Sequence, residues 1–271
     1  RQMCIRDSSY SLPGVRDAEG YTFMGWSTKP MQSVSPQYEA EEKITVNGNV
    51  DLYAVVFNRT TETDLTEDQL PQVDIYKYKQ VIFVGDSRTE FMENVLTGMG
   101  ESATKNVKFV CSAGKGLDWF TTTGWAQLYS IVQHDSNSIL SKKTAVIFNF
   151  GVNDLSKSAD YAEYYNWIAP QLKSKGCELY FMSVNPVNRL MLPNAGRADR
   201  SEAAVRSFNQ YMKANLSSAY TYIDMYSYLK STGYSFASDH YGTGTVDDGL
   251  HYTTRTYKRI FAKCMDSLRV P

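Results

Sequence analysis

Acyl transfer is the chemistry suggested by a serine and a distant Asp-x-x-His sequence. Ser87 follows an apolar run at a predicted helix start, where backbone N–H groups and the helix dipole stabilise developing negative charge. Serine is a poor nucleophile without a base in hydrogen-bonding reach and a third group that orients this base. His251 precedes a predicted C-terminal helix, and Asp248, three residues upstream, can hold its imidazole. These three residues are our candidates for nucleophile, base and acid.

The other histidines and the cysteines offer weaker chemistry. His134 lies among polar residues far from a strand end, whereas His240 lies in a loop rich in Gly and Ser and is the rival base. No histidine lies three to five residues from another histidine or a cysteine, and the four cysteines are widely scattered: Cys4, Cys111, Cys177 and Cys264. We therefore expect no metal site, no disulfide framework and no cofactor.

Each candidate also has an ordinary structural explanation. Ser87 could be a helix N-cap, and an Asp-x-x-His sequence can arise by chance. Asn153 and Asp154 could be turn residues, and Gly114 and Gly116 could relieve a tight turn. Their joint occurrence in this order along the chain favours the functional interpretation.

Strand and helix patterns alternate from residue 75 onward. Apolar runs predict strands at 80–84, 107–111, 144–150, 178–183 and 220–223, and helical spacing predicts helices at 89–99, 161–173, 201–216 and 253–268. Repeated strand-helix units indicate a parallel five-stranded sheet between two helical layers, a three-layer α/β/α fold. Sites in such sheets lie beyond the carboxyl ends of the strands. The loops that begin at Gly85, Ser112, Gly151 and Asn185 are therefore the places to search, together with the stretch before the last helix.

The N-terminal segment has a different, all-β pattern. Residues 9–58 form this segment, and Asn47-Gly48-Asn49 between apolar stretches at 44–46 and 50–56 predicts a hairpin. Residues 59–74, rich in Thr and acidic side chains, read as a linker with little to bury, and residues 75–271 form the α/β domain.

Composition excludes several classes of function. The 28 Lys and Arg balance 29 Asp and Glu, a formal net charge of −1, so we expect no nucleic-acid partner and no binding to an anionic membrane by bulk charge. No apolar run approaches the length of a membrane span. The chain begins with Arg, and residues 1–8 look like translated sequencing-adapter sequence, so we expect the natural N-terminus, with any signal peptide, to be missing.

Four sequence blocks together resemble the SGNH, or GDSL-like, hydrolase family over residues 78–268. They are Gly85-Asp86-Ser87-Arg88, Cys111-Ser112-Ala113-Gly114-Lys115-Gly116, Gly151-Val152-Asn153-Asp154 and Asp248-Gly249-Leu250-His251. The resemblance implies a flavodoxin-like fold with Ser87 as nucleophile and Asp248 and His251 as acid and base. It implies an oxyanion hole formed by the N–H groups of Ser87 and Gly116 (with Gly114 as second choice) and by the Asn153 amide.

The resemblance further implies a serine esterase that acts on O-acyl esters. Arg88 stands where the family name has Leu, and it could meet a substrate carboxylate. Trp119, Asn185 and Tyr252 are the other candidate substrate contacts. The aromatic residues near the site loops, Trp119, Phe120, Trp125, Tyr241 and Tyr252, suit sugar rings, although aromatic residues more often serve the core. O-acetyl esters on carbohydrate or cell-wall glycans are the favoured substrate. The alternatives are an O-acetyltransferase and a lipase or lysophospholipase of the same family.

Residues 9–58 resemble the internalin-type B repeat of bacterial surface proteins. The matching residues are Gly20-Tyr21-Thr22-Phe23-Met24-Gly25-Trp26-Ser27 and Leu52-Tyr53-Ala54-Val55, while Val56-Phe57 replaces the usual final Trp. The resemblance implies a small β-grasp-like module on a protein that is secreted or held at the bacterial surface. A plain linker hairpin is the alternative for this segment, and a non-catalytic glycan-binding surface protein is the alternative for the chain. The oligomeric state is left open.

Overall fold

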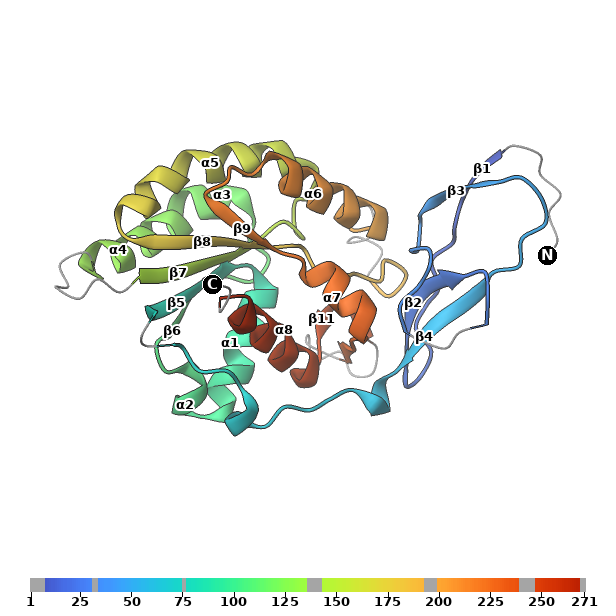
Figure 1. The fold of residues 1–271 in the computed structure, drawn as a ribbon, viewed down its shortest axis with the longest axis horizontal. Coiled ribbons are helices and arrows are strands. Elements are labelled where there is room, and N and C mark those ends of the chain that lie inside the picture. Colours follow the sequence, from blue (N-terminus) through green and yellow to red (C-terminus); the bar gives the residue numbers. More distant parts are fainter. Residues whose placement is uncertain are drawn as a thin grey trace. The chain divides into compact units, whose positions relative to one another are not determined.

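Two compact units make up the chain in the computed structural model, which describes residues 8–30, 34–74, 77–135, 143–192, 199–238 and 247–268 (Figure 1). The first unit contains Arg1–Thr63, Asn185–Arg206 and Tyr226–Thr253. The second contains Asp64–Val184, Ser207–Met225 and Thr254–Pro271. The N-terminal β-rich segment thus shares its unit with two segments from much later in the chain.

A five-stranded parallel sheet forms the centre of the second unit. Its strands are β5 (Tyr78–Gly85), β6 (Val107–Cys111), β7 (Lys143–Asn149), β8 (Cys177–Met182) and β9 (Tyr220–Ile223), in the order β6-β5-β7-β8-β9. All neighbours run parallel, and the order is that of flavodoxin-like sheets. The expected fold class is confirmed.

Helices cover both faces of this sheet. The helices of the described residues are α1 (Ser87–Met99), α2 (Glu101–Thr104), α3 (Leu117–Trp119), α4 (Trp125–Asp135), α5 (Ser158–Ser174), α6 (Glu202–Asn215), α7 (Met225–Thr232) and α8 (Thr254–Ser267). Figure 1 shows α3, α4 and α5 over one face of the sheet and α1 and α8 over the other. On the first face Phe120 contacts Phe148 (ring centroids 5.7 Å apart), and on the second Phe83 contacts Phe261 (5.8 Å). Burial on both faces explains why these strands are continuous apolar runs.

Helical structure at 117–135 was not predicted. Between α3 and α4 lies a π-helical turn, Phe120–Gly124. Gly124 lies against the Trp119 ring, where a Cβ would come within 2.7 Å of Cζ3, so this turn depends on a close contact that the helical period does not reveal. The short helix α7 was missed as well, and so was a two-stranded antiparallel sheet in the first unit, formed by β10 (Phe236–Ser238) and β11 (Asp247–Tyr252).

The N-terminal segment is all-β, but its predicted hairpin is wrong. Its strands are β1 (Ser8–Ser11), β2 (Tyr21–Ser27), β3 (Lys43–Val46) and β4 (Tyr53–Asn58). β3 pairs with β1, and β4 pairs with β2, both antiparallel. Val50 is 47% exposed, whereas Met24 and Val55 in the β2–β4 pair are fully buried. Pairing of distant strands therefore buries more apolar surface than a local Asn-Gly hairpin would.

The predicted linker at 59–74 is more firmly held than its composition suggests. In the first unit, Ser235 donates a 2.6 Å hydrogen bond to the buried carboxylate of Glu62. In the second unit, Leu70 and Val73 are buried, and Lys258 donates to Asp64 at 2.6 Å. Two 3-10 turns, Arg59–Thr61 and Glu67–Gln69, order the stretch. A third 3-10 turn, Leu155–Lys157, precedes α5.

Candidate active site

Three candidate loops begin at the same level of the sheet. Gly85, the last residue of β5, is the register partner of Cys111 at the end of β6 and of Asn149 at the end of β7. The backbone N–H of Ser112 also donates to the Gly85 carbonyl at 3.3 Å. Ser87, Gly116 and Asn153 all follow these residues within a few positions, so one edge of the sheet carries them, as the strand pattern predicts.

Ser87 is the first residue of α1. Asp86 caps the helix, since its side chain accepts a 3.0 Å hydrogen bond from the Arg88 N–H. The turn from β5 is tight, because a Cβ on Gly85 would come within 1.9 Å of Thr89 Oγ1 and 2.8 Å of the Asn149 carbonyl oxygen. Asp86 caps the helix, so Ser87 is not the N-cap residue. Its hydroxyl is thus held beside the positive end of the helix dipole.

Gly116 and Asn153 lie on loops that are bonded to each other. The Asn153 Nδ2 donates a 2.8 Å hydrogen bond to the carbonyl of Lys115. An amide NH2 carries two hydrogens, so this bond also fixes the direction of the second one. The Gly116 N–H donates no hydrogen bond to another of the described residues. Gly116 is the N-cap residue of α3. Both groups can therefore serve as donors to a developing oxyanion.

Asp154 is a structural residue of the site that the sequence did not single out. Its Oδ2 accepts from the Leu117 N–H at 2.9 Å, and its Oδ1 accepts from the Tyr161 hydroxyl at 2.7 Å. A Cβ on Gly116 would come within 2.3 Å of Asp154 Oδ2, so the loop fits the carboxylate closely. Burial raises the pKa of Asp154 above its ordinary value, against these two hydrogen bonds, which favour the charged form.

Asp248 and His251 form a hydrogen-bonded pair in the first unit. His251 Nδ1 lies 2.5 Å from Asp248 Oδ2, and the backbone N–H groups of His251 and Leu250 donate to Asp248 Oδ1 at 2.7 and 2.8 Å. Burial alone would raise the pKa of Asp248, but the hydrogen bonds and charge of His251 lower it below its ordinary value. The ionised carboxylate can only accept, so Nδ1 carries the hydrogen and the basic lone pair lies on Nε2.

The sequence located this pair in the stretch before the last helix and gave it no secondary structure. Both residues lie on β11, which pairs with β10 through Phe236–Tyr252 and Ser238–Asp247. Gly249 between them has φ +68, which lets three residues curl so that the carboxylate reaches the ring. The pair belongs to the first unit, and Ser87, Gly116 and Asn153 belong to the second.

The candidate substrate contacts differ in exposure. Arg88 is 3% exposed and Asn185 is 1% exposed. Tyr252 is 1% exposed, donates its hydroxyl to the Pro186 carbonyl at 2.5 Å and stacks on Phe236, which gives it a packing role in the first unit. Trp119 is half-buried and directly follows the Gly116 loop.

Among the remaining aromatic candidates, Phe120 is fully buried in the core of the second unit. The ring of Trp125 lies against Tyr129, with centroids 5.3 Å apart. His240, the rival base, and Tyr241 lie outside the described residues. Of the described aromatic candidates, Trp119 and Trp125 are partly exposed, and Trp119 is the nearer of the two to Gly116 in the sequence.

Residues 36–264 match the GDSL-like Lipase/Acylhydrolase family, so the match spans most of the chain, including all four sequence blocks. The chain belongs to this family of acylhydrolases. Residues 2–55 match the Listeria-Bacteroides repeat domain, a match that includes most of the residues expected to be foreign. The N-terminal segment of this acylhydrolase therefore contains a Listeria-Bacteroides repeat, and we refer to it as the repeat.

Solved structures similar to this acylhydrolase share little of its sequence. One is described as an acylhydrolase from Bacteroides fragilis, with 15% identity, TM-score 0.48 and coverage of 74% of this chain and 93% of that chain. An acetyl xylan esterase has 11% identity and TM-score 0.45 (70% and 100% covered). The catalytic domain of peptidoglycan O-acetyltransferase A from Streptococcus pneumoniae has 15% identity and TM-score 0.42 (70% and 92% covered). The search of curated proteins finds no match.

Among the described residues of this acylhydrolase, no helix has the length and apolar character needed to cross a membrane. No cluster of three or more His, Cys, Asp or Glu side chains in the same residues is arranged to hold a metal ion.

Proposed function

We propose that this acylhydrolase is a serine esterase in which Ser87 is the nucleophile, His251 the general base and Asp248 the residue that orients it. The observation that carries the proposal is the 2.5 Å hydrogen bond between His251 Nδ1 and Asp248 Oδ2. It fixes the tautomer whose Nε2 can accept a proton, and the imidazolium that follows is stabilised by the carboxylate. A binding module has no need of such a pair.

The reaction proceeds in two halves. His251 Nε2 takes the proton of Ser87 Oγ while Oγ bonds to the ester carbonyl carbon, and the N–H groups of Ser87 and Gly116 and the amide of Asn153 hold the oxyanion. The C–O bond to the alcohol then breaks, and His251 returns the proton to the leaving oxygen. Water, deprotonated by His251, attacks the acyl-enzyme and releases the acid and Ser87.

O-acetyl esters on carbohydrate or cell-wall glycans are the substrate class that we propose. A half-buried indole, Trp119, stands directly beyond the loop that carries Gly116, and a partly exposed aromatic face suits a sugar ring. The Listeria-Bacteroides repeat supports a secreted protein or one held at the bacterial surface, where such glycans occur. A small acyl ester or glycan is thus the partner of the site.

Hydrolysis of p-nitrophenyl acetate by the wild type, Ser87→Ala and His251→Ala tests the catalytic proposal. We expect both variants to lose nearly all activity and to lose it about equally, because the two residues act as a unit. A fluorophosphonate probe should label Ser87 in the wild type. Equal rates for wild type and Ser87→Ala would refute the proposal and favour a glycan-binding protein.

A substrate panel tests the specificity. Acetylated xylan, chitin fragments, acetylated peptidoglycan and short-chain lipid esters are incubated with enzyme, and released acetate or fatty acid is measured. Release of acetate from a glycan supports the proposed class. Activity on lipid esters alone would instead identify a lipase, and acetyl transfer to an added sugar without free acetate would identify an O-acetyltransferase.

A further inference from the structure

The N-terminal repeat contacts the turn that separates Asp248 from His251. The residue that connects them is Asn188, on the segment that follows β8. Its backbone N–H donates to the Gly249 carbonyl at 2.8 Å, and a Cβ on Gly249 would come within 2.4 Å of the Asn188 carbonyl oxygen. The backbone of Asn188 therefore lies directly against the turn that sets the Asp248–His251 geometry.

The side chain of Asn188 is bonded to the repeat. Its Nδ2 donates to the Val15 carbonyl at 3.0 Å and to Asp17 Oδ1 at 2.8 Å. Its own Oδ1 accepts from the Leu190 N–H at 3.1 Å. Both amide hydrogens are thus donated to the repeat, and Asn188 as a whole is 9% exposed.

Asp17 is in turn held firmly within the repeat. Its Oδ1 also accepts from the Phe23 N–H of β2 at 3.0 Å, and its Oδ2 pairs with Arg59 at 2.7 Å. Arg59 Nε donates to Thr22 Oγ1 at 2.9 Å, which ties the pair to β2 again. The Asp17 side chain has no exposed surface. A buried carboxylate with this many donors has one available position, so it can transmit the position of β2 to Asn188.

The sheet formed by β10 and β11 has a second connection to the N-terminal part of the chain. Ser235, just before β10, donates to Glu62 at 2.6 Å, and its carbonyl accepts from the Thr253 N–H at 3.0 Å. Gly233 lies against Phe57 of β4, where a Cβ would come within 2.2 Å of the ring. The strand that carries His251 is therefore linked to the N-terminal part of the chain at its middle, through Asn188, and just beyond its C-terminal end, through Thr253 and Ser235.

From this connected path we infer that the repeat is a working part of the active site, and that Asp17 and Asn188 are positioning residues for the Asp248–His251 pair. The inference rests on the proposed serine esterase function. The path Asp17–Asn188–Gly249 gives the repeat control over the angle at which the carboxylate meets the imidazole. A small error in that angle lowers turnover without weakening substrate binding.

Kinetics of four variants of the full chain test the inference. Asn188→Ala and Asp17→Ala should lower kcat for p-nitrophenyl acetate by about 10- to 100-fold and leave KM near the wild-type value. Asp17→Asn keeps an Oδ1 that can accept from Asn188 but loses the ion pair with Arg59, so it should retain more activity than Asp17→Ala. Glu41→Ala is the control, because Glu41 accepts from the Ala203 N–H and lies 3.9 Å from Arg189 Nη1 but does not bond to the Gly249 turn or to the Asn188 side chain. We expect its kcat to be unchanged.

A second background separates positioning from general destabilisation. In His251→Ala, the residue on which Asn188 acts is absent, so Asn188→Ala should cause no further loss of residual activity. The melting temperature of each variant is recorded. A loss of kcat in Asn188→Ala that exceeds the loss in Glu41→Ala at a similar melting temperature is then not explained by destabilisation. An equal fold-loss in both backgrounds would overturn the inference in favour of a purely structural role.

A spectroscopic measurement reads the pair without any substrate. The chain has three histidines, so in a ¹⁵N-histidine-labelled sample the hydrogen-bonded Nδ1–H of His251 can be assigned by its loss in His251→Gln. We expect this downfield signal in the wild type, Asp17→Asn and Glu41→Ala, and its loss or broadening in Asp17→Ala and Asn188→Ala. An unchanged signal in the last two variants would overturn the inference. Absence of Ser87-dependent hydrolysis in the wild type would instead refute the proposed function, and this signal would still decide the positioning role.

Discussion

The Asp154 carboxylate accepts a hydrogen bond from the backbone N–H of Leu117, with Oδ2 and N 2.9 Å apart. This bond joins the loop after β7 to the loop after β6, and the Asn153–Lys115 bond of 2.8 Å runs beside it in the neighbouring residues. The two loops that carry the proposed Gly116 and Asn153 donors are therefore fixed as one piece. Preorganised donors of this kind need not move as the oxyanion forms.

Asp154→Ala should loosen this joint. The Leu117 N–H and the Tyr161 hydroxyl lose their acceptor, which costs about 1–3 kcal/mol of stability for each group left buried. The displaced loops should lower kcat by roughly 10- to 100-fold, with KM little changed. Asp118→Ala is the control, because its ion pair with Lys157 lies at the surface and its side chain is 85% exposed. Equal kcat for Asp154→Ala and wild type would show that the joint is not needed for catalysis.

Asn153→Ala removes one proposed oxyanion donor directly. Loss of such a donor typically costs about 3–4 kcal/mol of transition-state stabilisation, so kcat should fall by roughly 10²–10³-fold. Ester hydrolysis at saturating substrate measures this loss. The Lys115 carbonyl also loses its partner, so the melting temperature is recorded alongside, and Lys115→Ala keeps that carbonyl and serves as the control. A loss below tenfold would argue that Asn153 does not face the oxyanion.

Gly116→Ala and Gly114→Ala distinguish the two candidate glycines. A Cβ at Gly116 would lie 2.3 Å from Asp154 Oδ2, so the loop has to shift, and we expect kcat to fall by roughly 10- to 100-fold. Gly114 has φ +69 with open space around its Cβ position, so alanine there costs roughly 1–2 kcal/mol of backbone strain and leaves kcat unchanged. The reverse order of kcat losses would assign the donor to Gly114.

The parallel sheet could be predicted from the sequence because its strands carry their own signal. Val81 and Val84 are completely buried between two helical layers, and such strands appear as uninterrupted apolar runs with helical patterns between them. The positions of Ser87, Gly116 and Asn153 at one edge of this sheet could be predicted for a similar reason, because each follows a strand within a few residues. Their catalytic roles remain predictions.

Contacts between distant residues were beyond the reach of the sequence. Asn188 and Asp17 are 171 positions apart, and nothing in either neighbourhood indicates that one amide and one carboxylate will meet. β11 escaped notice for the same reason, because Asp247–Tyr252 lacks strand alternation and is a strand through its pairing with β10. The Asn-Gly hairpin was predicted from a strong local turn signal, and this prediction is wrong because β4 pairs with the distant strand β2 instead.

Asp248→Asn should change the pH dependence of stability. The pKa of Asp248 lies below its ordinary value of 3.8, so the folded state holds the ionised form more tightly than the unfolded state does. This contribution is fully present above the unfolded pKa and is lost as the pH falls through the lower, folded pKa. The stability difference between wild type and variant should therefore stay constant from about pH 7 to pH 5 and shrink below about pH 4. Urea unfolding at several pH values measures it, and a difference independent of pH would refute the assignment.

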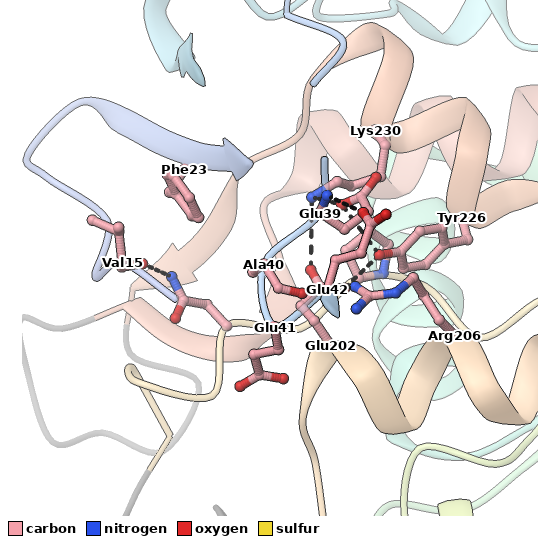
Figure 2. A network of polar contacts seen from close by, with 12 residues as sticks. Val15, Phe23, Glu39, Ala40, Glu41, Glu42, Glu202, Arg206, Tyr226 and Lys230 are labelled. Carbon is pink, nitrogen blue, oxygen red and sulfur yellow. Dashed lines mark hydrogen bonds and ion pairs between the residues drawn. The ribbon is translucent and has the colours of Figure 1, made fainter. Parts of the chain in front are cut away.

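Lys230→Met should destabilise the first unit through the charges it leaves behind. The Lys230 side chain is 5% exposed, and its Nζ lies 2.8 Å from Glu39 Oε2 and 3.8 Å from Glu202 Oε1 (Figure 2). Burial raises the pKa of Glu202, and the Tyr226 hydroxyl donates to it at 2.6 Å. Without the ammonium, the two carboxylates keep the charge of Arg206 nearby but lose their ion pair with Lys230, which costs about 3 kcal/mol.

A double variant identifies which interaction accounts for the stability lost in Lys230→Met. Lys230→Met combined with Glu202→Gln removes the buried negative charge as well, so it should recover a large part of the lost stability. Urea unfolding of wild type, Lys230→Met and the double variant gives the three values. If the double variant is no more stable than Lys230→Met, packing of the lysine stem, and not its charge, holds this part of the unit together.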